Sequence, residues 1–165
     1  MDLIMTPNYS TSGSPINHAQ LRSYRPGDWQ AMHALDLICF SPVFRFSRGA
    51  MRSFAEAPGA VIVLAEAQCI LAGFCIAQLE ASTGYVITLD VAPEWRRHGL
   101  ARRLMAELEA RLLTAGAAEM KLHVFTGNTA AIAIYESIGY ARLATEDNFY
   151  AQNLHAHVYR KRLAA

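Results

Sequence analysis

The chain has 165 residues and a mass of 18.2 kDa, which is the size of one ordinary domain. Its residues are 53% hydrophobic and 18% charged, and its formal net charge is +1. This composition excludes intrinsic disorder and argues against a binder driven by bulk charge, so we expect no nucleic acid as the primary ligand. The longest apolar run, residues 69–77, is too short to span a bilayer, and we expect no membrane association.

The cysteine usage is typical of a reducing compartment. Cys39, Cys69 and Cys75 form no Cys-x-x-Cys pair and cannot all be paired within one chain. The first residues also lack the cationic start and apolar core of a signal peptide. We therefore expect a cytoplasmic protein whose three cysteines are buried structural thiols rather than acyl-carrying nucleophiles.

The N-terminal half predicts a tail followed by two helices and a meander. Residues 1–19 show no hydrophobic periodicity and predict a flexible tail before a domain of residues 20–165. A short strand is expected at 21–25, and Asp28 is placed to cap a helix that ends near Cys39. A second helix follows at 47–57. Segments rich in aliphatic, β-branched and aromatic residues then predict three antiparallel strands, at 60–66, 70–80 and 85–91.

After Pro93 the pattern changes to helices alternating with strands. Apolar residues at helical spacing predict a helix over 99–115, and residues 120–125 predict a strand. A helix at 128–137, closed by Gly139, and strands at 140–143 and 154–163 complete the chain. We predict one α/β (α+β) domain with a single mixed, mostly antiparallel sheet of about seven strands and flanking helices.

A first motif lies where the third predicted meander strand ends. From Val91 to Ala101 a strand stops at Pro93, and a short basic turn containing Gly99 opens a helix. The first amides of a helix have no intrahelical partner and lie at the positive end of its dipole, so this turn suits a phosphate. The same residues are equally well explained as a solvated basic helix start. Neither a phosphate-loop motif nor Gly-x-Gly-x-x-Gly is present.

A second motif follows one strand later. Asn128, Ala131 and Tyr135 lie on one face of the predicted helix, with Asn128 and Tyr135 two turns apart. A single ligand could contact the amide, the small residue and the phenol. The alternative is an N-cap, a packing alanine and a core tyrosine.

Together, in this order and spacing, the motifs resemble the GNAT superfamily of acyl-CoA-dependent N-acyltransferases, over nearly the whole chain from Leu21 to about Leu163. The resemblance implies the GNAT fold, acetyl-CoA (coenzyme A) as cofactor, and direct attack of a primary amine on the thioester. Tyr135 would protonate the leaving thiolate. The residues it places at the cofactor are Leu89, Asp90, Val91, Arg96, Arg97, His98, Gly99, Leu100, Ala101, Arg102, Asn128 and Ala131.

Within the superfamily, the second half is similar to bacterial ribosomal-protein alanine N-acetyltransferases and related N-terminal acetyltransferases. Asn148-Phe149-Tyr150 carries this similarity, because that subgroup has an aromatic pair in the loop before the last strand. It implies that Phe149 and Tyr150 bind the N-terminus of a protein or peptide substrate. The alternative role for the two rings is hydrophobic packing between strands.

Two positions depart from the subgroup. His123 stands where its members have a glutamate as general base, and His155 is nearest to a missing acidic residue. An imidazole titrates close to neutral pH and suits deprotonation of an α-amine. Strand alternation places His123 opposite the apolar face, as expected for a general base acting directly or through water. A solvent-facing or helix-packed histidine is the other possibility.

Other functions remain open at this point. His155 and His157 share one strand face, but no third ligand is visible, and we expect no metal. A small-amine acetyltransferase and a non-catalytic acyl-CoA sensor are alternatives to the N-terminal acetyltransferase. Retention of Tyr135 favours an enzyme, and the aromatic pair favours peptides. The sequence leaves a monomer or a homodimer undecided.

Overall fold

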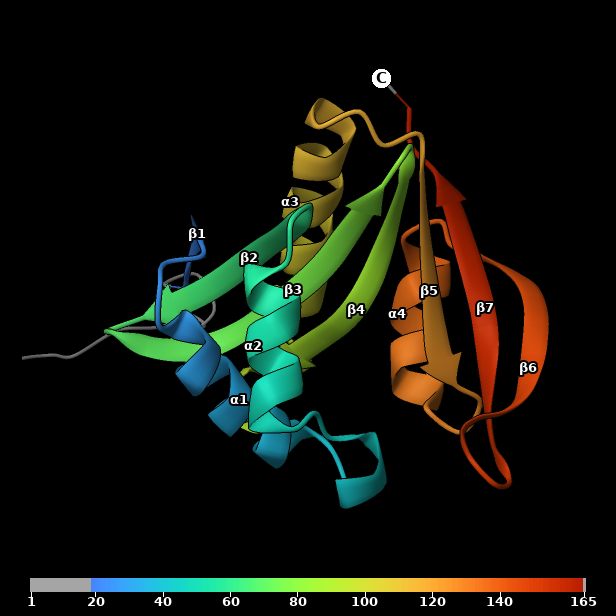
Figure 1. Cartoon of the computed structure of the whole chain (residues 1–165), viewed down its shortest axis with the longest axis horizontal. Coiled ribbons are helices and arrows are strands. Elements are labelled where there is room, and N and C mark those ends of the chain that lie inside the picture. Colours follow the sequence, from blue (N-terminus) through green and yellow to red (C-terminus); the bar gives the residue numbers. More distant parts are fainter. Residues whose placement is uncertain (1–18, 165) are drawn as a thin grey trace, which may run out of the picture.

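The computed structural model describes residues 19–164, which form one seven-stranded mixed sheet in the order β1-β2-β3-β4-β5-β7-β6 (Figure 1). The only parallel pair among these strands is β4 with β5; the others are antiparallel. The strands are β1 (Gln20–Ser23), β2 (Ala60–Ala67), β3 (Ile70–Glu80), β4 (Thr83–Val91), β5 (Glu119–Phe125), β6 (Ala141–Ala151) and β7 (Leu154–Arg162). The predicted sheet is thereby confirmed.

Two pairs of helices cover the two faces of the sheet. Helices α1 (Asp28–Cys39) and α2 (Arg48–Glu56) pack on one face, over a core that includes Met32, Met51 and Phe74. Helices α3 (Leu100–Thr114) and α4 (Thr129–Ser137) contribute to the core on the other face, which includes Leu104 and Met120. Two single-turn helices, Pro42–Phe44 and Pro93–Trp95, follow α1 and β4.

Several predicted boundaries and contacts were wrong. Asp28 does not cap α1: the N-cap is Gly27, and the Asp28 carboxylate instead pairs with Arg22 at 2.7 Å. The first strand is Gln20–Ser23, because residues after Ser23 turn away toward α1. Of the predicted tail, residues 1–18 lie outside the described part of the chain, and Ala19 is buried in the core.

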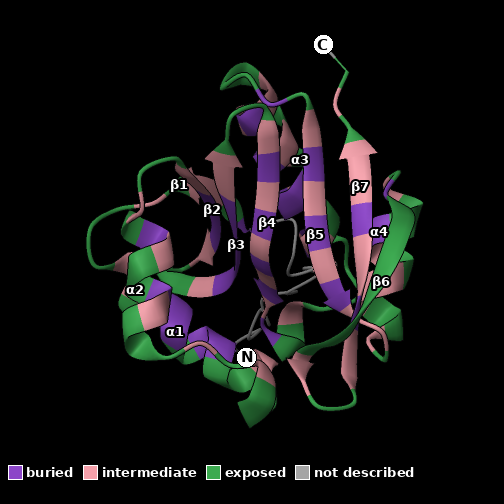
Figure 2. Ribbon diagram, turned by 45° about the vertical axis from the view of Figure 1, so that its right-hand side comes forward, coloured by how far each residue is buried: buried purple, intermediate pink, exposed green. Residues whose placement is uncertain are grey.

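The largest difference is β6, which runs to Ala151 rather than ending at residue 143. Its first nine residues are exposed, because it is one of the two edge strands of the sheet and only β7 pairs with it (Figure 2). Such a strand lacks the apolar alternation on which the prediction relied. Pairing with β7 forms it, with register shifts that include the Glu146–Ala151 stretch.

Strand β4 changes its surroundings halfway along. It pairs with β5 only from Thr83 to Val86, and the two strands then separate (Figure 1). At the same point Ile87 is an extra residue in the register with β3. Such a β-bulge reverses which face later side chains meet. Beyond it Leu89 and Val91 pack against the α3 face, which leaves Asp90 pointing toward α1.

The cysteines do not share one environment. Cys75 is fully buried, and burial raises the pKa of its thiol well above the usual range. Cys39 is half-buried and its thiol donates to the Val91 carbonyl at 3.4 Å. Cys69 is exposed, contrary to the prediction, because it and Gln68 form a two-residue hairpin turn with positive φ at both positions.

Within residues 19–164 no helix has both the length and the apolar character needed to cross a bilayer.

Substitution of Gly73 tests how closely β3 must approach β4. A Cβ at this position would lie 2.8 Å from the Asp90 carbonyl oxygen and 3.1 Å from Leu104 Cδ1. We expect Gly73→Ala to lower the free energy of unfolding by roughly 1–3 kcal/mol, the usual range for overpacking, in a urea titration. Gly49→Ala in α2 is the matched control, since its Cβ would contact nothing within 4 Å. Equal stability of both variants would contradict the close approach.

Candidate active site

The N-terminus of α3 has backbone amides that no side chain caps. Gly99, its N-cap, has φ +88°, no side chain caps the helix, and Arg103 N makes the first intrahelical bond, to Gly99 O at 3.1 Å. The amides of Leu100, Ala101 and Arg102 therefore have no partner in the helix. The Leu100 side chain is buried in the core, so only its amide can contribute. A Cβ on Gly99 would meet nothing within 4 Å, which leaves these donors open to a pyrophosphate.

The basic residues before the helix divide into two kinds. Arg97 and His98 are exposed beside the open amides, and Arg97 has a positive φ of 63°. Arg96 instead folds back, and its Nε donates to the Val91 carbonyl at 2.9 Å. Arg96 therefore fixes the end of β4, whereas Arg97 and His98 remain available to a phosphate.

The second half of β4 presents a free peptide edge. Ala92 N donates to Ala72 O of the neighbouring β3, so peptide groups two and four residues earlier also face β3. Those of Leu89 and Val91 consequently face the opposite side, where β5 has moved away. The Val91 carbonyl already accepts from Arg96 Nε and Cys39 Sγ, so the free groups of this edge are those of Leu89 and the Val91 amide. This edge suits the amides of a pantetheine arm. The Asp90 side chain points away from this edge, toward α1, and the residue is only 1% exposed.

Helix α4 supplies the second motif. Asn128 caps it, accepting from Ala131 N at 3.2 Å, and Asn128 Nδ2 makes no hydrogen bond within the described residues. Ala131 is half-buried against the core, and Tyr135 is 7% exposed beside Tyr140. Burial raises the pKa of Tyr135, so its hydroxyl keeps its proton at neutral pH. The structure brings the motif together as both a helix cap and a candidate proton donor.

His123 lies on the opposite face of the sheet from Tyr135, in a cluster that the sequence did not reveal. Its Nδ1 is hydrogen-bonded to the hydroxyl of Tyr85 on β4, and its Nε2 lies 3.0 Å from Glu146 Oε2 on β6. The Phe149 ring stacks on the imidazole, with centroids 4.0 Å apart and planes at 6°. His123 is thus neither solvent-facing nor packed on a helix. It is enclosed by three side chains from other strands.

Phe149 and Tyr150 lie on β6 and not in a loop, which corrects the predicted location. They meet edge to face at 4.9 Å, and Tyr150 also contacts Phe44 at 5.1 Å. Phe44 belongs to the segment between α1 and α2 and contacts Phe125 of β5 at the same distance. Phe149 is 44% exposed. These four rings, the aromatic cluster, form an apolar wall next to His123.

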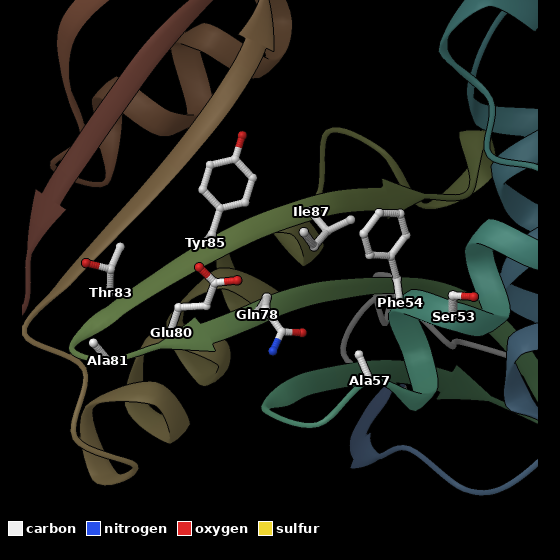
Figure 3. Close-up of a pocket in the computed structure, with 9 residues that line it drawn as sticks. All are labelled: Ser53, Phe54, Ala57, Gln78, Glu80, Ala81, Thr83, Tyr85 and Ile87. Atoms are coloured by element: carbon white, nitrogen blue, oxygen red, sulfur yellow. The ribbon is translucent and has the colours of Figure 1, made fainter.

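An open groove extends from Tyr85 along the same face of the sheet, with a volume of about 750 Å³ (Figure 3). Residues of α2, β3 and β4 line it, and Glu80 is its one carboxylate among the described residues. Tyr85 points away from the groove floor toward β5, where it contacts His123. Burial raises the pKa of Tyr85 to about 12, so its hydroxyl is also protonated at neutral pH.

The histidines of β7 are engaged by β6. His155 Nδ1 accepts from Asn148 N at 3.0 Å, and His157 Nδ1 is 2.8 Å from Thr145 Oγ1. Neither is part of the His123 cluster.

Alternation along β4 and β5 places Tyr85 and His123 on one face, so a known register between the strands would have revealed Tyr85. The sequence near Glu146 and Phe44 gives no signal of either residue. Pairing of β6 with β7 brings Glu146 to the site, and the course of the segment between α1 and α2 brings Phe44 there.

Comparison with known proteins gives a consistent assignment. Residues 29–140 match the acetyltransferase (GNAT) family. The [ribosomal protein bS18]-alanine N-acetyltransferases of Salmonella typhimurium and Escherichia coli K12 are each 35% identical over 80 residues. This region is 48% of this chain and 54% of theirs, so the chain spans about half the length of the curated relatives it matches.

Solved structures share the fold. The ribosomal-protein-S18-alanine N-acetyltransferase from Escherichia coli superimposes with a TM-score of 0.82 at 23% identity, covering 89% of this chain and 95% of that one. Arabidopsis thaliana Naa50, in complex with the bisubstrate analogue CoA-Ac-MVNAL, gives a TM-score of 0.76 at 24% identity, covering 88% and 99%.

Proposed function

Because this chain belongs to the GNAT acetyltransferase family, we propose that it transfers an acetyl group from acetyl-CoA to the α-amine of a protein or peptide N-terminus. The observation that carries the proposal is the enclosure of His123 by Tyr85, Glu146 and Phe149, beside the point where β4 and β5 separate. The bS18-alanine relatives and the peptide-analogue complex of Naa50 support a peptide as the acceptor.

The residues present fit acetyl-CoA. The open amides of Leu100, Ala101 and Arg102 would bind its pyrophosphate, with Arg97 and His98 beside them. The free edge at Leu89 and Val91 would hold the pantetheine arm, and Asn128 Nδ2 would contact it from α4. When bound, acetyl-CoA supplies an acetyl thioester.

Tyr85 and His123 would remove the proton of the attacking amine. The Tyr85 oxygen accepts that proton as its own passes to His123 Nδ1, and the Glu146 carboxylate stabilises the resulting imidazolium. Because its pKa of about 12 keeps the Tyr85 hydroxyl protonated at neutral pH, Tyr85 can accept the amine proton only by passing its own proton to His123. From the other face, Tyr135 would donate its hydroxyl proton to the departing sulfur.

The aromatic cluster would position the substrate. Phe149 leaves 44% of its surface exposed while covering His123, so a substrate amine must pass its ring. The apolar wall of Phe44, Phe125 and Tyr150 favours the first side chain of a peptide over a multiply charged small amine. The groove at Tyr85 contains a single carboxylate among the described residues, which also gives little support to a polyamine substrate.

We also propose a cytoplasmic location, supported by three free thiols, of which Cys69 is exposed.

Incubation of the protein with acetyl-CoA, a library of peptides with free N-termini, and a panel of small amines tests the proposed function. We expect mass spectrometry to find the acetyl group on peptide α-amines. Acetylation confined to small amines would show that the protein is a small-amine acetyltransferase and would contradict the proposed peptide substrate. Binding of acetyl-CoA without any transfer would identify a sensor.

Removal of the Tyr135 hydroxyl tests the proposed acid. We expect Tyr135→Phe to bind acetyl-CoA normally by calorimetry while kcat falls by roughly 10²–10⁴, the range for a positioned proton donor. The control is Tyr159→Phe, which removes a buried hydroxyl bonded to Glu136 at 2.8 Å. It should lose stability of about 1–3 kcal/mol and keep its kcat. An unchanged kcat in Tyr135→Phe would refute the assignment.

The pH profile of His123→Ala tests the proposed base. An α-amine has a pKa of about 7.7–8.0, so at lower pH most of it is protonated and depends on the base. We expect the deficit in kcat/KM to be largest below about pH 8 and to shrink above it. Tyr85→Phe should reproduce this pattern, because it breaks the same proton path. A loss that is uniform across pH would indicate a structural role for His123.

A further inference from the structure

Two aspartates outside the proposed mechanism are buried together beneath the site. Asp36 of α1 is 0% exposed and Asp90 of β4 is 1% exposed. A carboxylate in such surroundings is costly unless it is paired or keeps its proton. Within the described residues neither forms a salt bridge, so their charge must be managed in another way.

Each carboxyl uses one oxygen in an ordinary hydrogen bond. Asp36 Oδ2 accepts from Phe46 N at 2.9 Å, and Asp90 Oδ1 accepts from Thr88 Oγ1 at 2.6 Å. Asp36 Oδ1 and Asp90 Oδ2 are buried without another partner among the described residues. The two carboxyls lie within reach of each other, and a hydrogen bond between them requires one proton, because ionised carboxylates only accept.

The surrounding groups do not replace that proton. His33 and Arg45 act on Asp36 through space, and Arg96 acts on Asp90, but none of them bonds to either carboxyl. An ionised Asp90 would also disfavour ionisation of Cys39 on α1, Cys75 on β3 and Tyr135 on α4, so none of these three groups offsets a negative charge at Asp90. Burial raises the pKa of both aspartates, more strongly that of Asp90.

The pair joins the two halves of the site. Through Phe46 N it holds the segment that carries Phe44, whose ring contacts Tyr150 and Phe125. The carbonyl of Phe46 is also bonded to His33 Nε2 at 3.1 Å. On the other side Asp90 lies between Leu89 and Val91, the free edge assigned to acetyl-CoA. One contact therefore spans the substrate side and the cofactor side.

We propose that Asp36 and Asp90 are positioning residues that share one proton, and that this proton holds the Phe44 segment against the cofactor strand. Asp90 donates it and Asp36 accepts it. The consequence for catalysis depends on the proposed function, but the shared proton does not.

The proton itself can be detected without turnover. Infrared spectra of protein labelled with ¹³C at aspartate carboxyl groups should contain a protonated-acid band at pH 7. Asp90→Asn and Asp36→Asn should each lack the band, because an amide then donates to the remaining carboxylate in the same geometry. A wild-type spectrum without the band, or a band that survives in both variants, would overturn the proposal even if acetyl transfer is confirmed.

The pH dependence of the free energy of unfolding gives a second test, because the shared proton fixes the sign of its slope. Above about pH 4 the unfolded chain has released this proton and the folded chain keeps it. The pair's contribution to the free energy of unfolding therefore decreases as pH rises, until the folded pair releases its proton. We expect this descending part in the wild type and its absence in Asp90→Asn; the same slope in both would contradict the shared proton.

Asp28→Asn is the matched control for the pH test. Its hydrogen bond to Arg22 lowers the pKa of Asp28, so its contribution to stability is present above the unfolded pKa and is lost as pH falls. Removing it should leave the descending slope in place.

Kinetics test the positioning role. Asp90→Asn should keep the KM for the peptide within about threefold of the wild type at pH 7. Asp36→Ala removes the acceptor of Phe46 N, so we expect it to raise the KM for the peptide roughly tenfold or more, with a smaller effect on kcat. Rescue by Asp36→Asn of the loss in Asp36→Ala is expected, since the asparagine oxygen accepts from Phe46 N. Equal KM values in Asp36→Ala and the wild type would refute the positioning role.

Discussion

Strand β4 is hydrogen-bonded to β5 over only its first four residues, while β3 accompanies it to the end. Polar peptide groups require partners, so the unpaired edge at Leu89 and Val91 is the constraint around which the site is organised. The chain then passes through the single turn Pro93–Trp95 to the N-terminus of α3, whose first amides have no partner in the helix. A sheet that stayed paired would leave no place for an extended ligand with amides and phosphates.

The separation of the two strands also connects two faces that a continuous sheet would isolate. Tyr135 belongs to the α3 and α4 side, whereas Tyr85 and His123 face the side of α1 and α2. In the proposed reaction, the base and the acid would therefore come from opposite faces of the sheet.

The sequence predicted what local pattern determines. The order of helices and strands, the glycine before α3 and the Asn128 cap follow from periodicity and from residue preferences near each position. Tyr85, Glu146 and Phe44 were missed because they reach His123 or its neighbours through strand register and through the course of the segment between α1 and α2. Strand β6 was predicted too short, since an exposed edge strand has no apolar alternation to reveal it. The buried Asp36–Asp90 contact depends on both register and bulge, and no single stretch of sequence contains it.

The bulge at Ile87 determines which face of the sheet each later side chain of β4 meets. If the same residues of β4 continued past Val86 in regular pairing, Leu89 and Val91 would point toward α1, and Asp90 would point into the apolar core under α3. Deletion of Ile87 itself would remove the bulge and leave Thr88 to Val91 on their present faces, because Thr88 would then follow Val86 in regular alternation. The site requires the pairing of Thr88 with Ile76, and a strand with or without the extra residue meets that requirement.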